Sequence, residues 1–209
     1  PGGTVNDVSR TLGMSLDPVL AAQDIVTGRE FPIDIGSFGP DRWFVYVAAF
    51  GLFTGVAYRT PQEDKQALGR LAYFLRGVME LGEVKPVHVR VETETAAMEL
   101  DVLDGLVCST TSVGGVLALD SLGISLNDGQ SELLLVRDIK NLIDFNNVST
   151  ALLRSDFRNN ENIVSQKIRR VRFVFDKPVD WTLDGEYGGT VTDVEIINHQ
   201  RAVNIIVPR

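Results

Sequence analysis

The feature that most constrains the fold of this chain is a long series of short β-prone segments separated by turn residues. In the segment 87–92, valines alternate with polar side chains, as expected of a strand with one buried face. Short strands are also predicted around Ile33 and Phe44, on either side of the turn 39–41. Similar patterns recur in further segments: 98–103, 106–110, 131–137, 171–175, 190–197 and 202–207. Many strands with few helices predict a mainly β fold, an antiparallel β-sandwich or barrel.

Helices are predicted at a few places around these strands. The helical spacing of apolar residues predicts a short helix near the amino terminus and longer helices within 64–81 and 138–155. Another helix is predicted to begin at Asp17, which can cap free amides, followed by Pro18, which suits the first helical position. Gly28 suits its end. The chain is therefore expected to be mainly β with a few helices, the β-rich domain spanning 31–209 after a helical segment at 1–30.

Composition excludes several classes of protein. A net charge of −8 argues against nucleic-acid binding through a broad basic surface. The single cysteine, Cys108, cannot form an internal disulfide, which fits a reducing compartment, and its neighbours predict a core position. No run of about 18 apolar residues is present, so no transmembrane helix is expected. The first residues lack the basic start and apolar core of a signal peptide and read as the interior of a longer chain.

Two motifs in the first 36 residues carry candidate chemistry. The glycine turn at 2–3 leads into a helix, whose free amides can bind an anion, and Thr4 and Asn6 add a hydroxyl and an amide. A plain capped helix is the alternative. Asp34 lies between two isoleucines, and a half-buried carboxylate there needs a partner or a metal ion. Its alternative is a strand residue that points to solvent.

Two more motifs lie in the second half of the chain. Asp184 and Glu186 flank Gly185, and in an extended backbone their carboxylates project on one side, which suits a general base or a cation site. A β-turn is the alternative, because Asp-Gly is a common turn pair. In the segment 125–130, Asp128 and nearby carbonyl groups are ligands that a hard cation prefers, with a hairpin turn as the alternative.

Taken in their order along the chain, with the segment 125–130 before Asp184 and Glu186, the four motifs resemble those of the bacterial diacylglycerol kinase-like lipid kinases, whose relatives include sphingosine, ceramide and NAD kinases. Members of that family have an amino-terminal ATP-binding domain with a Gly-Gly-Asp-Gly-Thr loop, which this sequence lacks, and a carboxy-terminal β-sandwich. The resemblance implies that 31–209 is the carboxy-terminal lipid kinase domain and that 1–30 is a remnant of the ATP-binding domain. It also implies that this portion alone is inactive.

The resemblance also implies roles for single residues. Thr4 matches a threonine that contacts the nucleotide, and Asn6 lies in the same cofactor-binding segment. Asp34 matches an aspartate of a water and magnesium network between the domains. Asp184 and Glu186 match an acidic pair assigned to catalysis, one of them as the proton acceptor; physical reasoning from the sequence leaves open which one.

Two further sites follow from the resemblance. Asp128 matches a structural magnesium ligand, joined by the backbone carbonyls of Ser125 and Gln130, although Asn127 stands where a second aspartate is common. Arg70, on the predicted helix at 65–81, is the nearest match to a basic residue that contacts the lipid surface. A few basic residues suffice for transient docking to anionic lipid.

The expected function is ATP-dependent transfer of the γ-phosphate to a lipid hydroxyl, with ATP and Mg²⁺ as cofactors. The expected partners are a lipid substrate at the inner face of the membrane, in the cytoplasm, with no nucleic acid and with a possible homodimer through an exposed sheet edge. Two alternatives are an NAD kinase-like enzyme for a soluble metabolite and a non-catalytic β-sandwich that binds a ligand. The latter needs an exposed aromatic platform, whereas Trp43 and Trp181 are both expected in the core.

Overall fold

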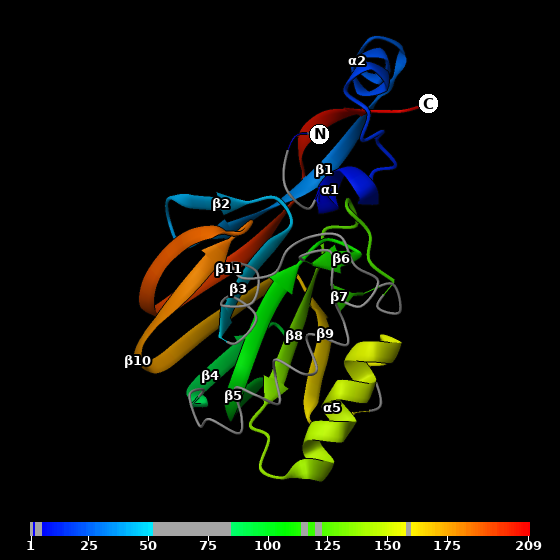
Figure 1. Cartoon of the computed structure of the whole chain (residues 1–209). Coiled ribbons are helices and arrows are strands. Elements are labelled where there is room, and N and C mark those ends of the chain that lie inside the picture. The colour runs from blue at the N-terminus through cyan, green and yellow to red at the C-terminus, as the bar shows by residue number, and fades with distance from the viewer. Residues whose placement is uncertain (1, 3–5, 52–84, 114–116, 120–122, 158–159) are drawn as a thin grey trace.

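The computed structural model describes residues 2, 6–51, 85–113, 117–119, 123–157 and 160–209. These residues form one long, strongly bent antiparallel sheet and a separate two-stranded sheet, together with a few helices (Figure 1). The strands are β1 Arg29–Phe38, β2 Arg42–Phe44, β3 Val47–Gly51, β4 Val87–Thr93, β5 Ala97–Cys108, β6 Ser112–Val113, β7 Leu117–Ala118, β8 Ser131–Arg137, β9 Ile163–Ile168, β10 Arg170–Leu183 and β11 Glu186–Val207. The predicted mainly β fold class is confirmed.

The helices in the described residues are α1 (Asp7–Thr11), α2 (Pro18–Thr27) and α5 (Leu142–Arg154). As predicted, the carboxylate of Asp17 caps α2 by accepting hydrogen bonds from two backbone amides, and α2 ends at Gly28. The predicted helix within 138–155 is confirmed as α5. The predicted helix at 64–81 lies outside the described residues.

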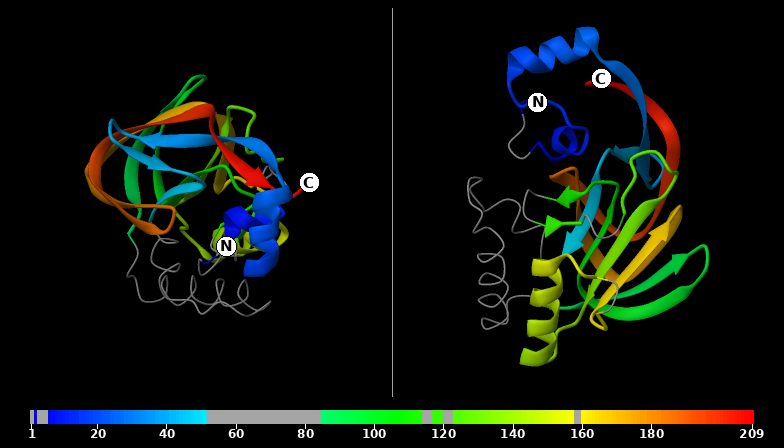
Figure 2. Two further views of the ribbon diagram at one scale, coloured as in Figure 1. Left: turned by 90° about the horizontal axis from the view of Figure 1, so that it is seen from above. Right: turned by 90° about the vertical axis from the view of Figure 1, so that its right-hand side faces the viewer.

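The sheet closes on itself in one place. Its strands follow the order β2-β1-β11-β10-β3-β5-β8-β9, and β4 pairs with both β10 and β5. The strands β10, β3, β5 and β4 therefore form a closed ring, a small barrel, while β1 and β11 continue beyond it. Figure 2 shows that these two strands extend to α2, so the C terminus and the first helices lie at the same end of the molecule.

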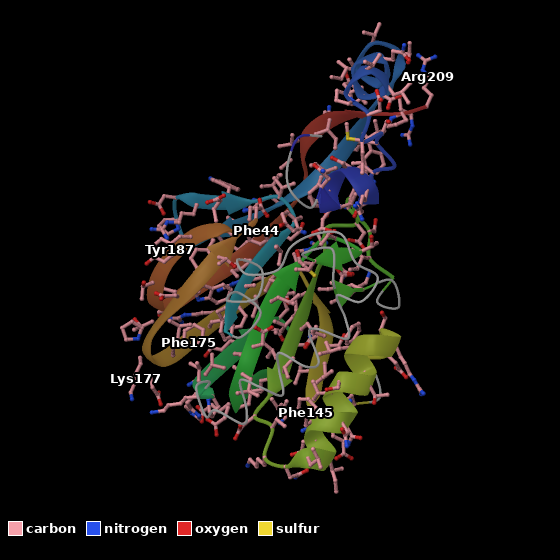
Figure 3. All side chains as sticks on the ribbon, in the orientation of Figure 1. Phe44, Phe145, Phe175, Lys177, Tyr187 and Arg209 are labelled. Atoms are coloured by element: carbon pink, nitrogen blue, oxygen red, sulfur yellow. The ribbon has the colours of Figure 1, made fainter. Side chains whose placement is uncertain are left out.

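Two hydrophobic cores lie on opposite faces of β3, β5 and β8. One core fills the barrel with aromatic side chains, among them Phe50, Phe173 and Trp181. The other lies under α5, where Phe145 points toward the strands (Figure 3). Because these strands are buried on both faces, their sequences are continuous apolar runs, such as the leucines at 133–135. They do not show the alternation of apolar and polar residues that marks a strand with one buried face.

The structure corrects some details of the sequence-based expectations. The segments predicted as separate strands at 98–103 and 106–110 form the single strand β5, and those at 190–197 and 202–207 lie within β11. Trp181 is fully buried, but the prediction of a buried Trp43 is wrong: its side chain is 56% exposed on the short edge strand β2. Its ring packs against His199 at a centroid distance of 5.0 Å, so it is not a free platform for a ligand.

Candidate functional site

The Asp-Gly-Glu motif forms the two-residue turn between β10 and β11. Asp184 and Gly185 both have positive φ angles, 51° and 89°, and Leu183 pairs with Glu186 across the turn. Asp-Gly suits this hairpin because aspartate and glycine tolerate left-handed backbone. The argument that the two carboxylates share one side of an extended backbone is therefore wrong, since the chain reverses between them.

The carboxylate of Asp184 is held by backbone amides of the connection between β2 and β3. Its Oδ2 accepts a hydrogen bond from Val45 N at 2.6 Å, and its Oδ1 accepts from Tyr46 N and Val47 N at 2.9 and 3.0 Å. The Asp184 amide donates in return to the Val47 carbonyl at 2.8 Å. Asp184 thus fixes the β10–β11 turn against the segment 45–47.

Asp34 is held in a similar way on β1. It is 2% exposed and lies where the register between β1 and β11 shifts, at a bulge that leaves Arg201 with a φ of 52°. Its two carboxylate oxygens accept hydrogen bonds from Gly129 N and Arg201 N, each at 2.7 Å. The Asp34 amide donates to the Leu126 carbonyl at 2.7 Å, so this residue joins β1, β11 and the 123–130 loop.

A small pocket between α1 and the sheet is lined by Asp34 and by residues of the segment that binds Asp184. Its empty space of about 250 Å³ includes open solvent, and its lining residues are Val8, Leu12, Ile33, Asp34, Val45, Tyr46, Thr110 and Leu126. Asp34 is one of the polar groups in its wall, and Tyr46, whose amide binds Asp184, is another. The pocket wall therefore combines Asp34 with the segment 45–46, which is hydrogen-bonded to Asp184.

Tyr46 experiences the negative charge of this corner. Burial, together with the nearby carboxylates of Asp7 and Asp184, raises the pKa of Tyr46 to about 12. Asp7, on α1, is only 3% exposed, and sequence reasoning did not single it out as a site residue. The signal was available, because Asp7 directly follows Asn6 in the Asn-Asp pair of the first motif.

Glu186 differs from the other two predicted acidic residues. Its side chain is exposed at the start of β11, and within the described part of the chain it makes no hydrogen bond and no ion pair. Its backbone is nevertheless fixed by the turn. Glu186 is therefore an exposed carboxylate on a fixed turn, without a partner among the described residues.

A lysine of β9, Lys167, binds the predicted metal loop. The Oδ1 atom of Asp128 accepts a hydrogen bond from Gln130 N at 3.1 Å. Its Oδ2 atom accepts one from Lys167 Nζ, also at 3.1 Å. Lys167 also donates to the Gly123 carbonyl at 3.0 Å and lies 3.5 Å from Glu132 Oε1. Burial raises the pKa of Glu132 to about 7, and the charge of Lys167 partly offsets that effect.

This geometry bears on the predicted divalent cation. Asp128 is the one carboxylate among the three expected ligands, and both of its oxygens already have partners, so a cation at Ser125, Asp128 and Gln130 would compete with Lys167. In the portion of the chain that the structure describes, no three His, Cys, Asp or Glu side chains are grouped so as to hold a metal ion. The magnesium site at this loop stays a prediction.

The other predicted site residues are placed as follows. Asn6 is the residue before α1 and has a left-handed backbone, with a φ of 56°. α1 has only five residues, shorter than the helix expected after the glycine turn. Thr4 and Arg70 lie outside the described residues. Among the helices of the described segments, none is long and apolar enough to span a membrane.

Comparison with known proteins gives relatives along the whole chain. The chain is 35% identical over 212 residues to a diacylglycerol kinase from Bacillus subtilis, an alignment that covers 100% of this chain and 68% of that protein. A diacylglycerol kinase from Staphylococcus epidermidis is 29% identical over 209 residues, with 65% of its length covered. No family model matches the chain.

Solved structures show the same fold. A diacylglycerol kinase from Bacillus anthracis superimposes on 99% of this chain with a TM-score of 0.69 at 17% identity, and 65% of that chain is covered. A second structure from the same organism, described as a candidate diacylglycerol kinase, gives a TM-score of 0.76 at 20% identity, with 66% of its chain covered. This chain thus spans about two thirds of the proteins it matches, and it belongs to the diacylglycerol kinase family.

Proposed function

We propose that this chain is the carboxy-terminal, β-rich part of an ATP-dependent lipid kinase that transfers the γ-phosphate of ATP to the hydroxyl of a diacylglycerol-like lipid. The observation that carries the proposal is the unpaired carboxylate of Glu186. It follows a turn that Asp184 anchors to the wall of a pocket, and that pocket also contains Asp34. The family relationship supplies the reaction class.

In the proposed reaction, Glu186 is the general base. An alcohol is a poor nucleophile at neutral pH, and a carboxylate within reach of it can accept its proton as the new bond to phosphorus forms. Asp184 is less suited to this role, because three backbone amides already occupy its oxygens. Its three hydrogen bonds support a positioning role instead.

Asp34 is also proposed as a positioning residue. Its oxygens are engaged by two amides, so it stabilises the bulge in β11 and the 123–130 loop. Mg²⁺ would enter the site with ATP as part of the substrate, and a role for Asp34 in a magnesium and water network is kept as a proposal. Thr4 and Asn6 are proposed to contact the nucleotide.

The division of the chain at residue 30 is supported by α2. On this helix Val19, Leu20, Ile25 and Val26 are exposed, Val26 to 84%, while only Ala21 is buried. Several exposed apolar side chains on one short helix are typical of a surface that another domain covers. We take it as the contact with an amino-terminal ATP-binding domain, and residues 1–30 as part of that domain. This chain alone is then inactive.

The proposed location is the cytoplasm, with transient binding to the inner face of the membrane. Arg70 is the proposed contact with the lipid surface. A homodimer through a sheet edge is also kept as a proposal; β2 and β9 are the edge strands of the main sheet in the described part of the chain.

The test is a kinase assay on the longer parent protein that contains this chain. The parent should transfer phosphate from ATP to diacylglycerol in mixed vesicles, and the isolated 209-residue chain should not. Parallel reactions with a sphingoid base, phosphatidylglycerol and NAD identify the acceptor. Phosphorylation of NAD without any lipid product would contradict the proposal and favour a soluble-metabolite kinase. Glycan binding without any kinase activity would instead favour a ligand-binding module.

A further inference from the structure

Tyr46 has a defined place in the wall of the pocket. Its backbone is fixed on both sides, because its amide donates to Asp184 and its carbonyl accepts from Ser109 N at 2.9 Å. Its ring lines the pocket next to Asp34 and Leu126. The side chain is therefore held by the scaffold and is directed into the candidate site.

The phenol oxygen of Tyr46 lies above the turn that carries Glu186. A Cβ built on Gly185 would lie 3.9 Å from Tyr46 Oη. Within the described residues, the hydroxyl has no hydrogen-bond partner. A partly buried hydroxyl without a partner among the described residues, next to the turn residue that precedes Glu186, is available for a ligand.

The charge of the surroundings indicates which ligand group would bind there. Asp7 and Asp184 both act on Tyr46 as negative charges, so an additional anion next to the phenol is disfavoured. A neutral alcohol fits better, because its oxygen can accept the hydrogen of the phenol while its own hydrogen points to a carboxylate. An alcohol bound at Tyr46 Oη would lie next to the turn residue that precedes Glu186.

We propose that Tyr46 Oη donates a hydrogen bond to the oxygen of the acceptor alcohol and orients the hydrogen of that alcohol toward Glu186. This inference rests on the proposed function. The acceptor oxygen forms a bond to the γ-phosphorus, the bond from that phosphorus to the β–γ bridging oxygen breaks, and ADP leaves with the electron pair. The proton of the alcohol passes to the Glu186 carboxylate, and Tyr46 keeps its own proton throughout.

The experiment compares Tyr46→Phe with the wild type in the parent kinase, using ATP and vesicles that contain diacylglycerol. Removing the hydroxyl should lower kcat roughly ten- to hundredfold, the range expected for the loss of one hydrogen bond to a reacting group. The KM for ATP should change by less than about twofold, because Tyr46 does not hold the nucleotide. The melting temperature should stay the same, because the hydroxyl has no protein partner.

A matched control is Tyr187→Phe. Tyr187 follows the same turn, but its side chain is 68% exposed, and its hydroxyl pairs with Thr190 Oγ1. This variant should retain the wild-type kcat. Equal kcat values for Tyr46→Phe and the wild type would overturn this inference and leave the proposed function intact. An equal loss of kcat in Tyr46→Phe and Tyr187→Phe would have the same meaning, as would a change confined to the KM for ATP. A wild-type parent that phosphorylates no lipid alcohol would overturn the proposed function, and this inference with it.

Discussion

Two neighbouring corners of the sheet carry carboxylates, and their charges are balanced in different ways. In the pocket corner, between α1 and the turn before β11, Asp34 and Asp184 accept hydrogen bonds only from backbone amides. In the lysine corner, formed by Asp128, Glu132 and Lys167, a single ammonium group lies between two carboxylates. The 123–130 loop connects the corners, because Gly129 N donates to Asp34.

This difference indicates which of the two corners is suited to catalysis. Backbone amides stabilise a carboxylate without adding a cationic side chain, so the pocket corner is rigid and still leaves Glu186 unpaired. In the lysine corner, the ammonium group already compensates the acidic charge, and the result is a structural contact. Similar residue types therefore have a proposed catalytic role in one corner and a structural role in the other.

The largest effect on stability is expected from Asp184→Gly. Glycine adopts the positive φ of this position freely, so the substitution removes the carboxylate without adding backbone strain. Loss of three charge-assisted hydrogen bonds should lower the free energy of unfolding by about 3–5 kcal/mol. Urea denaturation of the parent protein measures this change in the free energy of unfolding. A loss below about 1 kcal/mol would show that the hydrogen bonds between Asp184 and the segment 45–47 contribute little to stability.

A smaller loss is expected from Asp34→Asn. The substituted side chain keeps one acceptor oxygen but turns an NH₂ group toward either Gly129 N or Arg201 N, so one buried amide loses its partner. The expected change is about 1–3 kcal/mol. Hydrogen exchange should accelerate at both amides. Unchanged exchange at Gly129 and Arg201 would contradict the proposed link between β11 and the loop.

Lys167→Met tests the lysine corner. The change leaves the buried Glu132 carboxylate without its nearby positive charge, which should destabilise the protein by about 1–2 kcal/mol, less than for a fully buried pair because Lys167 is partly exposed. Phosphate transfer per folded molecule should stay the same. Lost transfer in a folded variant would mean that the two corners do not have separate roles.

The smallest effect is expected at an exposed ion pair, Arg172 with Asp193. Arg172 donates two hydrogen bonds to this carboxylate and holds the pKa of Asp193 below its ordinary value of 3.8. The pair therefore stabilises the fold above pH 3.8, and its contribution is lost as the pH falls through the lowered pKa. Asp193→Asn should shift the melting temperature by about 1 °C or less at pH 7, and a larger shift would contradict a surface role.

Local features of the structure could be predicted from the sequence. The alternation of Val87, Val89 and Val91 identified β4, and the pair Asp17-Pro18 identified the start of α2. The Asp-Gly pair at 184–185 suited a hairpin turn, and the structure has one. These features depend on neighbours in the sequence, which pattern and backbone preference describe well.

Contacts between distant segments could not be predicted. The amides that hold Asp184 belong to 45–47, and one that holds Asp34 belongs to Arg201, so only the folded sheet brings these groups together. The exposure of Trp43 was missed because a short edge strand has the same composition as a central one. Asp7 was missed although it belongs to the first motif, because the sequence does not show that its side chain is buried.

The most direct test of the central claim is the rate of phosphate transfer to diacylglycerol by Glu186→Gln in the parent kinase, measured with its unfolding curve. The account predicts a loss of about 100-fold or more in kcat, the scale of a missing general base, with an unchanged free energy of unfolding because this side chain has no protein partner. Transfer within about threefold of the wild type would contradict the claim that the unpaired carboxylate accepts the proton of the lipid.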